Sequence, residues 1–458
     1  MEKDTKGLLF QLEGKPSLNE TMPMAFQHVV AMIVGCITPA LLVGGVAGAN
    51  LSQDNLVLLI QMSLVIAGLS TLVQLFPIGK KIGSSLPVIL GVSFAYVPTM
   101  QSVASTYSKN PAFGSEKAIG VIVGAMIVGG ACALLFGMFV KYLKPLFPPL
   151  VTGTVVFTIG LSLYPIAIRY IGGGNAMAKD FANPKNLFVG FLTLAIVTAL
   201  NHFGKGFIKL SSILISIIIG YLVSIPLGLV NFSKIASSSI IINQNPILHF
   251  APQFETSVII SFVILFIVNS VQAIGDFTAT TVGGLDREPT EKELSGGIIA
   301  YGITNMLGSL IGGLPTATFS QNVGIVGTTK VVNRRVFAQA AIIILIAGLI
   351  PKFGALLTTI PTPVLGGATI PVFASITMTG IKLIAKEPLS FRNTSIIGLS
   401  VAIGMGVTSV PQLFNVEVYG PTALMVKTAI GSSPVVLATL CAIILNVIIP
   451  KKAEDIAK

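Results

Sequence analysis

Long apolar runs, separated by short polar or Gly/Pro-rich stretches, repeat along the whole chain. A run of about 20 apolar residues is long enough to cross the hydrocarbon core of a bilayer as a helix. The pattern predicts fourteen segments, near residues 23–48, 55–77, 84–100, 118–140, 147–166, 186–202, 207–230, 256–282, 295–313, 316–329, 335–353, 362–384, 393–412 and 428–450. The third and tenth segments are too short for an ordinary spanning helix and are rich in Gly, Pro, Ser and Thr. The sequence therefore predicts an all-α integral membrane protein with two interrupted spans.

Composition supports this class. Hydrophobic residues make up 53% of the 458 residues and charged residues only 10%, whereas soluble domains carry about 25% charged residues. The net charge of +11 would indicate nucleic acid in a soluble protein. In a membrane protein, Lys and Arg gather in cytoplasmic loops, so no nucleic-acid partner is expected and the lipid bilayer is the partner of the apolar surface.

The positions of the basic residues predict the orientation. If the N-terminus is inside and the segments alternate, most of the 28 Lys and Arg residues fall in inner loops. We therefore expect a multi-pass protein of the cytoplasmic membrane. Its two tails, residues 1–22 and 451–458, would both be cytoplasmic, as an even number of spans requires.

The two halves of the chain resemble each other. Ser93 lies six residues after Pro87, and Gln321 lies six residues after Pro315. A second echo pairs residues 147–153 with 360–366. Frequent use of Gly and Pro in membrane proteins is the alternative explanation. Two echoes in the same order favour seven spans followed by seven, and an odd number inverts the second copy in the membrane.

In transporters built from inverted repeats, interrupted segments meet near the bilayer midplane. Segments 3 and 10 should each be extended, as a short strand, up to about Ser93 or Gln321 and helical afterwards. The helix starts would present free N–H groups and positive dipole ends to a ligand. Gly324 would allow close approach of the backbone.

Polar side chains at membrane depth are candidates for a binding site. The carboxamides of Gln321 and Asn322 are costly to bury unless a partner pairs with them, and a planar ligand with N–H and C=O edges would be suitable. Asp276 lies within the apolar segment 8, and Gln272 precedes it by one helical turn on the same face. Asp276 is either functional or a structural carboxylate that pairs with hydroxyls or backbone N–H groups.

Other candidates have similar alternatives. His28, near the start of the first segment, is either a structural hydrogen-bonding group or a group that titrates near neutral pH. Phe94 is either a packing residue or a ring that stacks on a flat ligand. The sequence contains no catalytic set, metal-ligand spacing or phosphate-binding loop, so neither an enzyme, a metal site nor a cofactor is predicted.

Four motifs carry a resemblance to a known family. Gln321, Asn322, Gly324, Thr329 and Lys330 match the signature Q-N-x-G-x-x-x-x-T-K of the nucleobase–ascorbate transporter (nucleobase:cation symporter-2) family. Three further stretches are similar to its xanthine and uracil permeases: Gln27-His28, Pro87–Phe94 and Gln272–Asp276. The resemblance runs along nearly the whole chain.

The resemblance implies the domain organisation. Residues 23–140 and 256–353 would form a core domain that binds the base. Residues 147–230 and 362–450 would form a gate domain that also makes a homodimer. Core and gate would move against each other in alternating access.

The resemblance also assigns roles to residues. Substrate binding would fall to Gln321, Asn322, Gln272, Phe94, Ser93 and Gly324. Support or coupling would fall to Asp276, His28, Tyr301 and Thr329. Gln321 is similar to the purine members, so the expected substrate is xanthine or uric acid. A uracil or other nucleobase permease and an anion transporter of the same architecture are the alternatives.

Two positions depart from the family pattern. Gln272 stands where the family has a ligand-binding Glu, and Tyr301 stands where purine members commonly have an Asp. Neither side chain can supply a carboxylate for proton coupling. Symport with H+ through Asp276 or His28, symport with Na+, and facilitated diffusion therefore all remain open.

Overall fold

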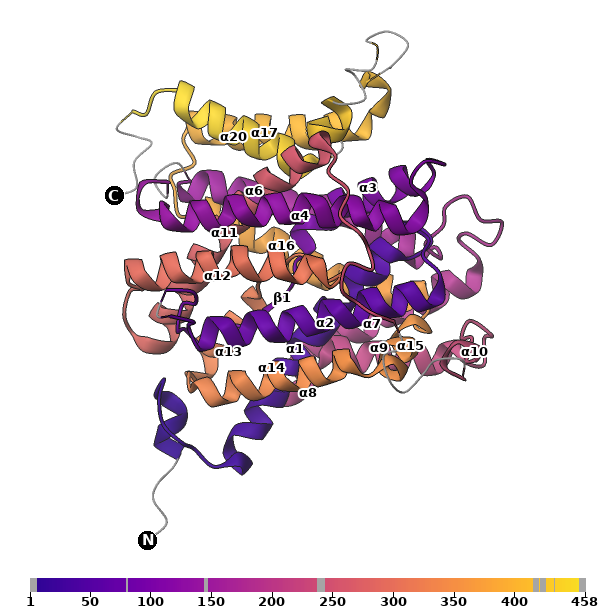
Figure 1. The fold of residues 1–458 in the computed structure, drawn as a ribbon, viewed down its shortest axis with the longest axis horizontal. Helices are drawn as coiled ribbons and strands as arrows, with labels where there is room; N and C mark the ends of the chain where they lie inside the picture. Colours follow the sequence, from indigo (N-terminus) through magenta and orange to yellow (C-terminus); the bar gives the residue numbers. More distant parts are fainter. Residues whose placement is uncertain are drawn as a thin grey trace.

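The computed structural model describes residues 6–79, 81–143, 147–236, 244–414, 420, 426–431 and 433–452. Residues 1–5 and 453–458 of the two predicted tails lie outside these ranges. The chain is mostly helical, and its long helices lie side by side across the view of Figure 1. Within the described ranges, seven helices are long and apolar enough to span a membrane. An eighth span results if one bent pair is counted as a single crossing.

The elements of the two halves follow the same order. The first half contains a 3-10 turn at Lys6–Phe10, α1 (Leu18–Gly44), α2 (Gln53–Leu75), β1 (Leu90–Val92), a 3-10 turn at Phe94–Tyr96, α3 (Val97–Ser108), α4 (Gly114–Met138), α5 (Val140–Leu143), α6 (Pro149–Ile171), α7 (Pro184–Phe203), α8 (Gly206–Leu210), α9 (Ser212–Ser224) and α10 (Ser233–Ala236). The second half contains α11 (Thr256–Leu285), α12 (Glu291–Leu310), β2 (Thr316–Thr318), α13 (Ser320–Thr329), α14 (Arg334–Leu349), α15 (Pro351–Thr358), α16 (Thr362–Ile384), α17 (Phe391–Ser409), a 3-10 turn at Pro411–Phe414, a π turn at Lys427–Gly431 and α20 (Pro434–Ile448).

Helix packing confirms the internal repeat. In the order of elements, α2 corresponds to α12 and α4 corresponds to α14. The structure packs α2 against α14 and α4 against α12, so one contact occurs twice with its partners exchanged. The contact between α7 and α9 in the first half recurs between α17 and α20 in the second, and α6 packs along its own counterpart α16. The count of fourteen spans stays a prediction.

The two interrupted segments meet as predicted. β1 and β2 pair antiparallel, with Leu90 opposite Thr318 and Val92 opposite Thr316. The extended backbone ends at the predicted places, because α13 begins at Ser320 and the 3-10 turn before α3 begins at Phe94. A Cβ on Gly91 would lie 2.6 Å from the Phe319 ring, so only glycine fits where the strands cross.

Side chains of neighbouring helices satisfy the backbone of these short strands. The Asn305 amide in α12 accepts from the Thr316 N–H at 2.7 Å and donates to the Thr316 carbonyl at 3.2 Å. The Thr71 hydroxyl in α2 accepts from the Leu90 N–H at 2.9 Å. Irregular backbone is stable at membrane depth only when protein groups or a wet cavity pair with it. α2 and α12, which are repeat partners, supply that pairing here.

Several predicted segments differ from the observed helices at a local breaker. The predicted span 335–353 is bent by 81° between α14 and α15, where Pro351 follows the break. The predicted span 207–230 is divided into α8 and α9, and α9 ends just before Pro226. In contrast, α3 continues to Ser108, past the predicted end at residue 100, because the next breaker is Pro111.

Most helix contacts fall into two groups. α1 to α4 pack with α11 to α14 around the paired strands. α6, α7 and α9 pack with α16, α17 and α20, of which α17 and α20 lie together at one edge of Figure 1. We call these the strand group and the outer group. The candidate site lies between them.

Candidate functional site

A cavity of about 720 Å³ lies between the two groups of helices. The strand group contributes Ser93, Phe94, Gln272, Asp276, Thr318, Ser320 and Gln321 to its lining. The outer group contributes Thr152, Val156 and Ile159 from α6 and Val372, Ser375 and Thr379 from α16. The wall from the strand group therefore presents amide, hydroxyl and carboxylate side chains beside the Phe94 ring, and the wall from the outer group presents apolar and hydroxyl side chains.

Gln321 is the amide best placed to bind a ligand. It lies in the first turn of α13, lines the cavity and is half-buried. Its side chain has no hydrogen-bond partner among the described residues. The carboxamide can therefore donate and accept at once toward a bound molecule. The N–H groups of the first two residues of α13 have no partner within the helix, as at any helix start.

Gln272 and Asp276 reach the cavity from α11, one turn apart. The Asp276 carboxylate accepts hydrogen bonds from the hydroxyls of Thr318 at 2.5 Å and Ser320 at 2.8 Å. These hydroxyls lie at the end of β2 and at the start of α13. Asp276 is nearly fully buried, at 8% exposure. Hydroxyl partners are what a structural role of Asp276 predicts. Asp276 also lines the cavity, as a functional role requires.

Asn322 and His28 form a pair away from the cavity lining. The Asn322 amide donates to the His28 ring Nδ1 at 3.0 Å and to the His28 carbonyl at 3.2 Å. Both side chains are 1% exposed, and the His28 ring packs on Phe337 with ring centres 4.5 Å apart. Asn322, the second amide of the signature, therefore connects α13 to α1. Gln321, the first amide, lines the cavity.

Ser93 and Phe94 both line the cavity from the other broken segment. The Ser93 hydroxyl donates to Asn269 in α11 at 3.1 Å and accepts from the Ala95 N–H at 3.3 Å. The Phe94 ring meets Phe373 of α16 edge-on, with centres 5.2 Å apart. Phe94 is thus a contact between the two groups as well as part of the cavity wall.

The remaining sequence candidates lie outside the cavity lining. The Tyr301 hydroxyl lies 2.5 Å from the Tyr96 hydroxyl, and both side chains are fully buried. The Thr329 hydroxyl donates to the Ile325 carbonyl at the end of α13. Gly324 is exposed, and a Cβ there would meet nothing within 4 Å. These three residues are not brought to the amides of Gln272 and Gln321.

Apart from Ser93, sequence reasoning did not single out the hydroxyl residues of the site. Thr318 and Ser320 lie just before the signature. Two hydroxyl residues next to a predicted helix start are a signal that could have identified them as candidates. Ser375 and Thr379 stand four residues apart on α16 and so share a face. Nothing in the sequence marks that face as the one opposite Gln272.

The fold and the site define a class of protein: a multi-span membrane protein with two broken segments crossing beside a polar cavity. The same fold is found in the transmembrane domain of a cyanobacterial bicarbonate transporter, BicA, with a TM-score of 0.60 and 16% identity. The match covers 95% of this chain and 100% of that one. The murine anion transporter Slc26a9 gives a TM-score of 0.59 at 15% identity, over 93% of this chain and 70% of that one. At such identities the likeness shows the fold alone.

Sequence relatives show the family. A family model described as "Permease family" matches residues 19–413, and the chain belongs to that family. The xanthine permease of Bacillus subtilis is 35% identical over 94% of this chain and 93% of its own length. The uric acid permease PucK of the same organism is 35% identical over 96% and 97%. The xanthine permease XanQ of Escherichia coli is 33% identical over 97% and 94%. The resemblance drawn from the four motifs is confirmed, and these relatives are permeases rather than enzymes.

Proposed function

We propose that this protein is a secondary transporter of an oxopurine, xanthine or uric acid, across the cytoplasmic membrane. The observation that carries the proposal is the unpaired carboxamide of Gln321 in the cavity, opposite the outer group and beside Gln272. An oxopurine has alternating N–H and C=O groups along its edge, which a carboxamide can pair with in both directions. The names of the relatives support the same class of substrate.

The cavity supports a division of labour among the candidate residues. Gln321 and Gln272 would pair with the edge of the base, and Phe94 would contact its face. Ser93 and Asp276 would hold the broken segments in place around it. Asn322 and His28 would fix the orientation of α13 from behind, through contacts outside the cavity.

We propose that the strand group is the core, residues 23–140 and 256–353, and that the outer group is the gate, residues 147–230 and 362–450. In our proposal these two bodies move against each other, with both tails cytoplasmic and with the gate also forming a homodimer. Transport would be coupled to H+ or Na+. Asp276 is the cavity's buried carboxylate and is the first candidate for that coupling, since Gln272 cannot titrate and Tyr301 carries no carboxylate.

Uptake of labelled xanthine into proteoliposomes tests the proposal. We expect uptake to exceed that of protein-free liposomes and to be competed by urate more strongly than by uracil or adenine. An imposed H+ or Na+ gradient should drive accumulation, and the gradient that does so identifies the coupling ion. Strong competition by uracil alone would favour a uracil permease. Uptake of bicarbonate or sulfate without xanthine uptake would favour an anion transporter.

A further inference from the structure

Two helices, one from each group, line the cavity along its length. α11 of the strand group contributes Gln272, Asp276 and Val282, and α16 of the outer group contributes Val372, Thr379 and Leu383. Together with Ala279 of α11 and Ser375 of α16, which also line the cavity, these residues recur at intervals of three or four, as one face of a helix does. The contact of Phe94 with Phe373 places the start of the α16 face at the level of the broken segments. Both faces then run in the same direction, over about 15 Å at 1.5 Å per residue.

A charged residue follows each of these two helices, and the two charges are opposite in sign. Glu288 follows the end of α11, Lys386 follows the end of α16, and both line the same cavity. Both are exposed, and neither side chain has an ion-pair or hydrogen-bond partner among the described residues. Two unpaired opposite charges therefore face one opening from two different bodies.

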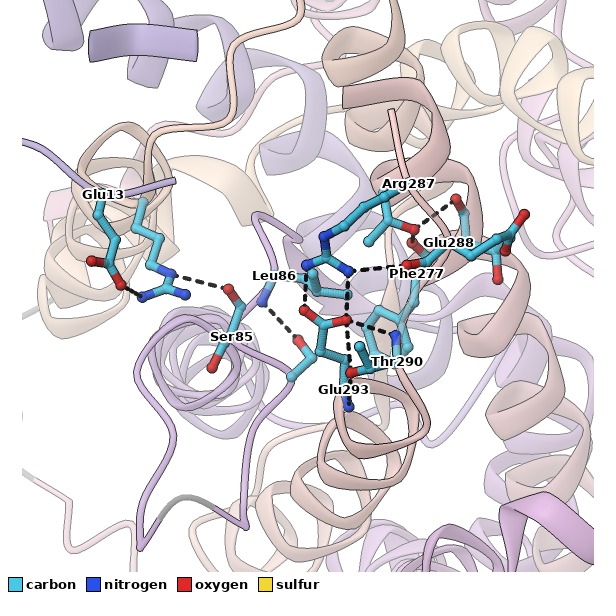
Figure 2. Close-up of polar contacts among 12 residues, drawn as sticks. Glu13, Ser85, Leu86, Phe277, Arg287, Glu288, Thr290 and Glu293 are labelled. Carbon is cyan, nitrogen blue, oxygen red and sulfur yellow. Dashed lines mark hydrogen bonds and ion pairs between the residues drawn. The ribbon is translucent and has the colours of Figure 1, made fainter. Parts of the chain in front are cut away.

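Glu288 is attached to the strand group through its backbone. Figure 2 shows Glu288 beside Arg287, whose guanidinium pairs with both carboxylate oxygens of Glu293, at 2.6 and 2.9 Å. The same guanidinium donates to the Glu288 carbonyl at 3.0 Å. Glu293 also caps the start of α12 together with Thr290. A bidentate pair of this kind fixes direction as well as distance, so Glu288 moves with α12.

Lys386 is attached to the outer group. Its N–H continues the last turn of α16 by donating to the Leu383 carbonyl at 3.2 Å. Hydrogen bonds between the two groups occur at the other end of the helices. Thr99 of α3 donates to Ser433 at the start of α20 at 2.8 Å, and Ser261 of α11 donates to the Ala429 carbonyl shortly before α20. At the end that carries Glu288 and Lys386, the two groups meet through an apolar contact, the Phe136 ring of α4 against the Phe147 ring just before α6, with centres 6.0 Å apart.

We propose that Glu288 and Lys386 act as a gating pair in the transport cycle: they form an ion pair when the two groups close this opening of the cavity. The inference rests on the proposed movement of core against gate. Opposite charges attract as the walls approach, and a like-charged pair would resist closure. The pair lies at the exposed rim of the cavity, where ion pairs are weak. It therefore shifts the equilibrium between open and closed states by a small free energy.

Charge reversal in the full-length protein tests the gating pair. We expect E288K and K386E each to lower the initial rate of xanthine uptake by about fivefold, the factor for about 1 kcal/mol. The double variant E288K/K386E should recover most of the rate, because the pair is restored with its signs exchanged. K382E is the matched control: it makes the same change one turn earlier on α16, outside the cavity lining. It should transport like the wild type.

A second measurement does not depend on transport. With the native Cys36, Cys132 and Cys441 replaced by alanine, E288C/K386C in membrane vesicles should be joined by a short bifunctional thiol reagent. The joined peptides would be identified by mass spectrometry. Two outcomes would overturn the gating pair: a double reversal no faster than the slower single variant, or no cross-link between the two cysteines. If the wild type takes up no purine while E288C/K386C still forms the cross-link, the proposed substrate is contradicted and the gating pair is supported.

Discussion

The carboxylate of Asp276 accepts a hydrogen bond from the hydroxyl of Ser320 at 2.8 Å. This contact ties the middle of α11 to the first residue of α13, across 44 positions of sequence. Because the same carboxylate also accepts from Thr318, it fixes the point where strand changes to helix. The position of Gln321, one residue later, therefore depends on Asp276 even if no ligand ever touches that carboxylate.

Replacement of Asp276 by alanine should lower stability as well as uptake. The buried hydroxyl of Thr318 would lose its partner, at a cost of about 1–3 kcal/mol in the free energy of unfolding. Asp276→Asn keeps one acceptor oxygen and should cost less. Thermal unfolding of the purified variants in detergent measures the difference. An alanine variant as stable as the wild type would mean that these hydroxyls find other partners. The carboxylate would then not stabilise the junction between β2 and α13.

Gln321→Ala should remove uptake while leaving the protein in the membrane. The ligand edge would lose a partner in both directions, about 1–3 kcal/mol for each polar group left unpaired, which corresponds to a loss of tenfold or more in apparent affinity. Binding of xanthine by isothermal titration and uptake in proteoliposomes both measure this loss. Thr328→Ala is the control, because Thr328 lies on the same helix, exposed and outside the cavity lining. Normal uptake by Gln321→Ala would remove this amide from the site.

The broken segments could be predicted because their cause is local. Pro87 and Pro315, with small and hydroxyl residues after them, cannot continue as ordinary helices in so short an apolar run. The spacing of Gln272 and Asp276 likewise places both on one face of a helix without any tertiary information. Local rules of this kind predicted the broken segments and the candidate residues that α11 presents, but not the outer wall.

The partners of the polar residues could not be predicted in the same way. Asn322 meets His28 across 294 positions of sequence, and which of two adjacent amides faces the cavity depends on how α13 is rotated against α1. The outer wall, with Ser375 and Thr379, depends on which face of α16 turns toward α11. Tertiary packing decides these rotations, and a single sequence carries no direct record of it.

The hydrogen bond between Tyr96 and Tyr301 can be tested for coupling between its two buried hydroxyls. Either single change to phenylalanine leaves a buried hydroxyl without its partner, and we expect each to cost about 1–3 kcal/mol in stability. The double variant Tyr96→Phe/Tyr301→Phe removes both hydroxyls and keeps the ring packing with Phe266. It should recover most of the loss, a coupling that a double-mutant cycle measures directly. Additive losses would show that each hydroxyl has a separate role.

At Gly91, the crossing of the two strands leaves no room for a side chain. An alanine Cβ would lie 2.6 Å from the Phe319 ring and 2.7 Å from the Cys36 sulfur, so one of them or the strand must move. Overpacking of a close-packed site costs about 1–3 kcal/mol, and here it would shift α13 together with Gln321. We therefore expect Gly91→Ala to lower both the unfolding temperature and xanthine affinity. Gly398→Ala on α17, where a Cβ meets nothing within 4 Å, should change neither. Wild-type affinity in Gly91→Ala would show that the crossing can relax without moving the binding amide.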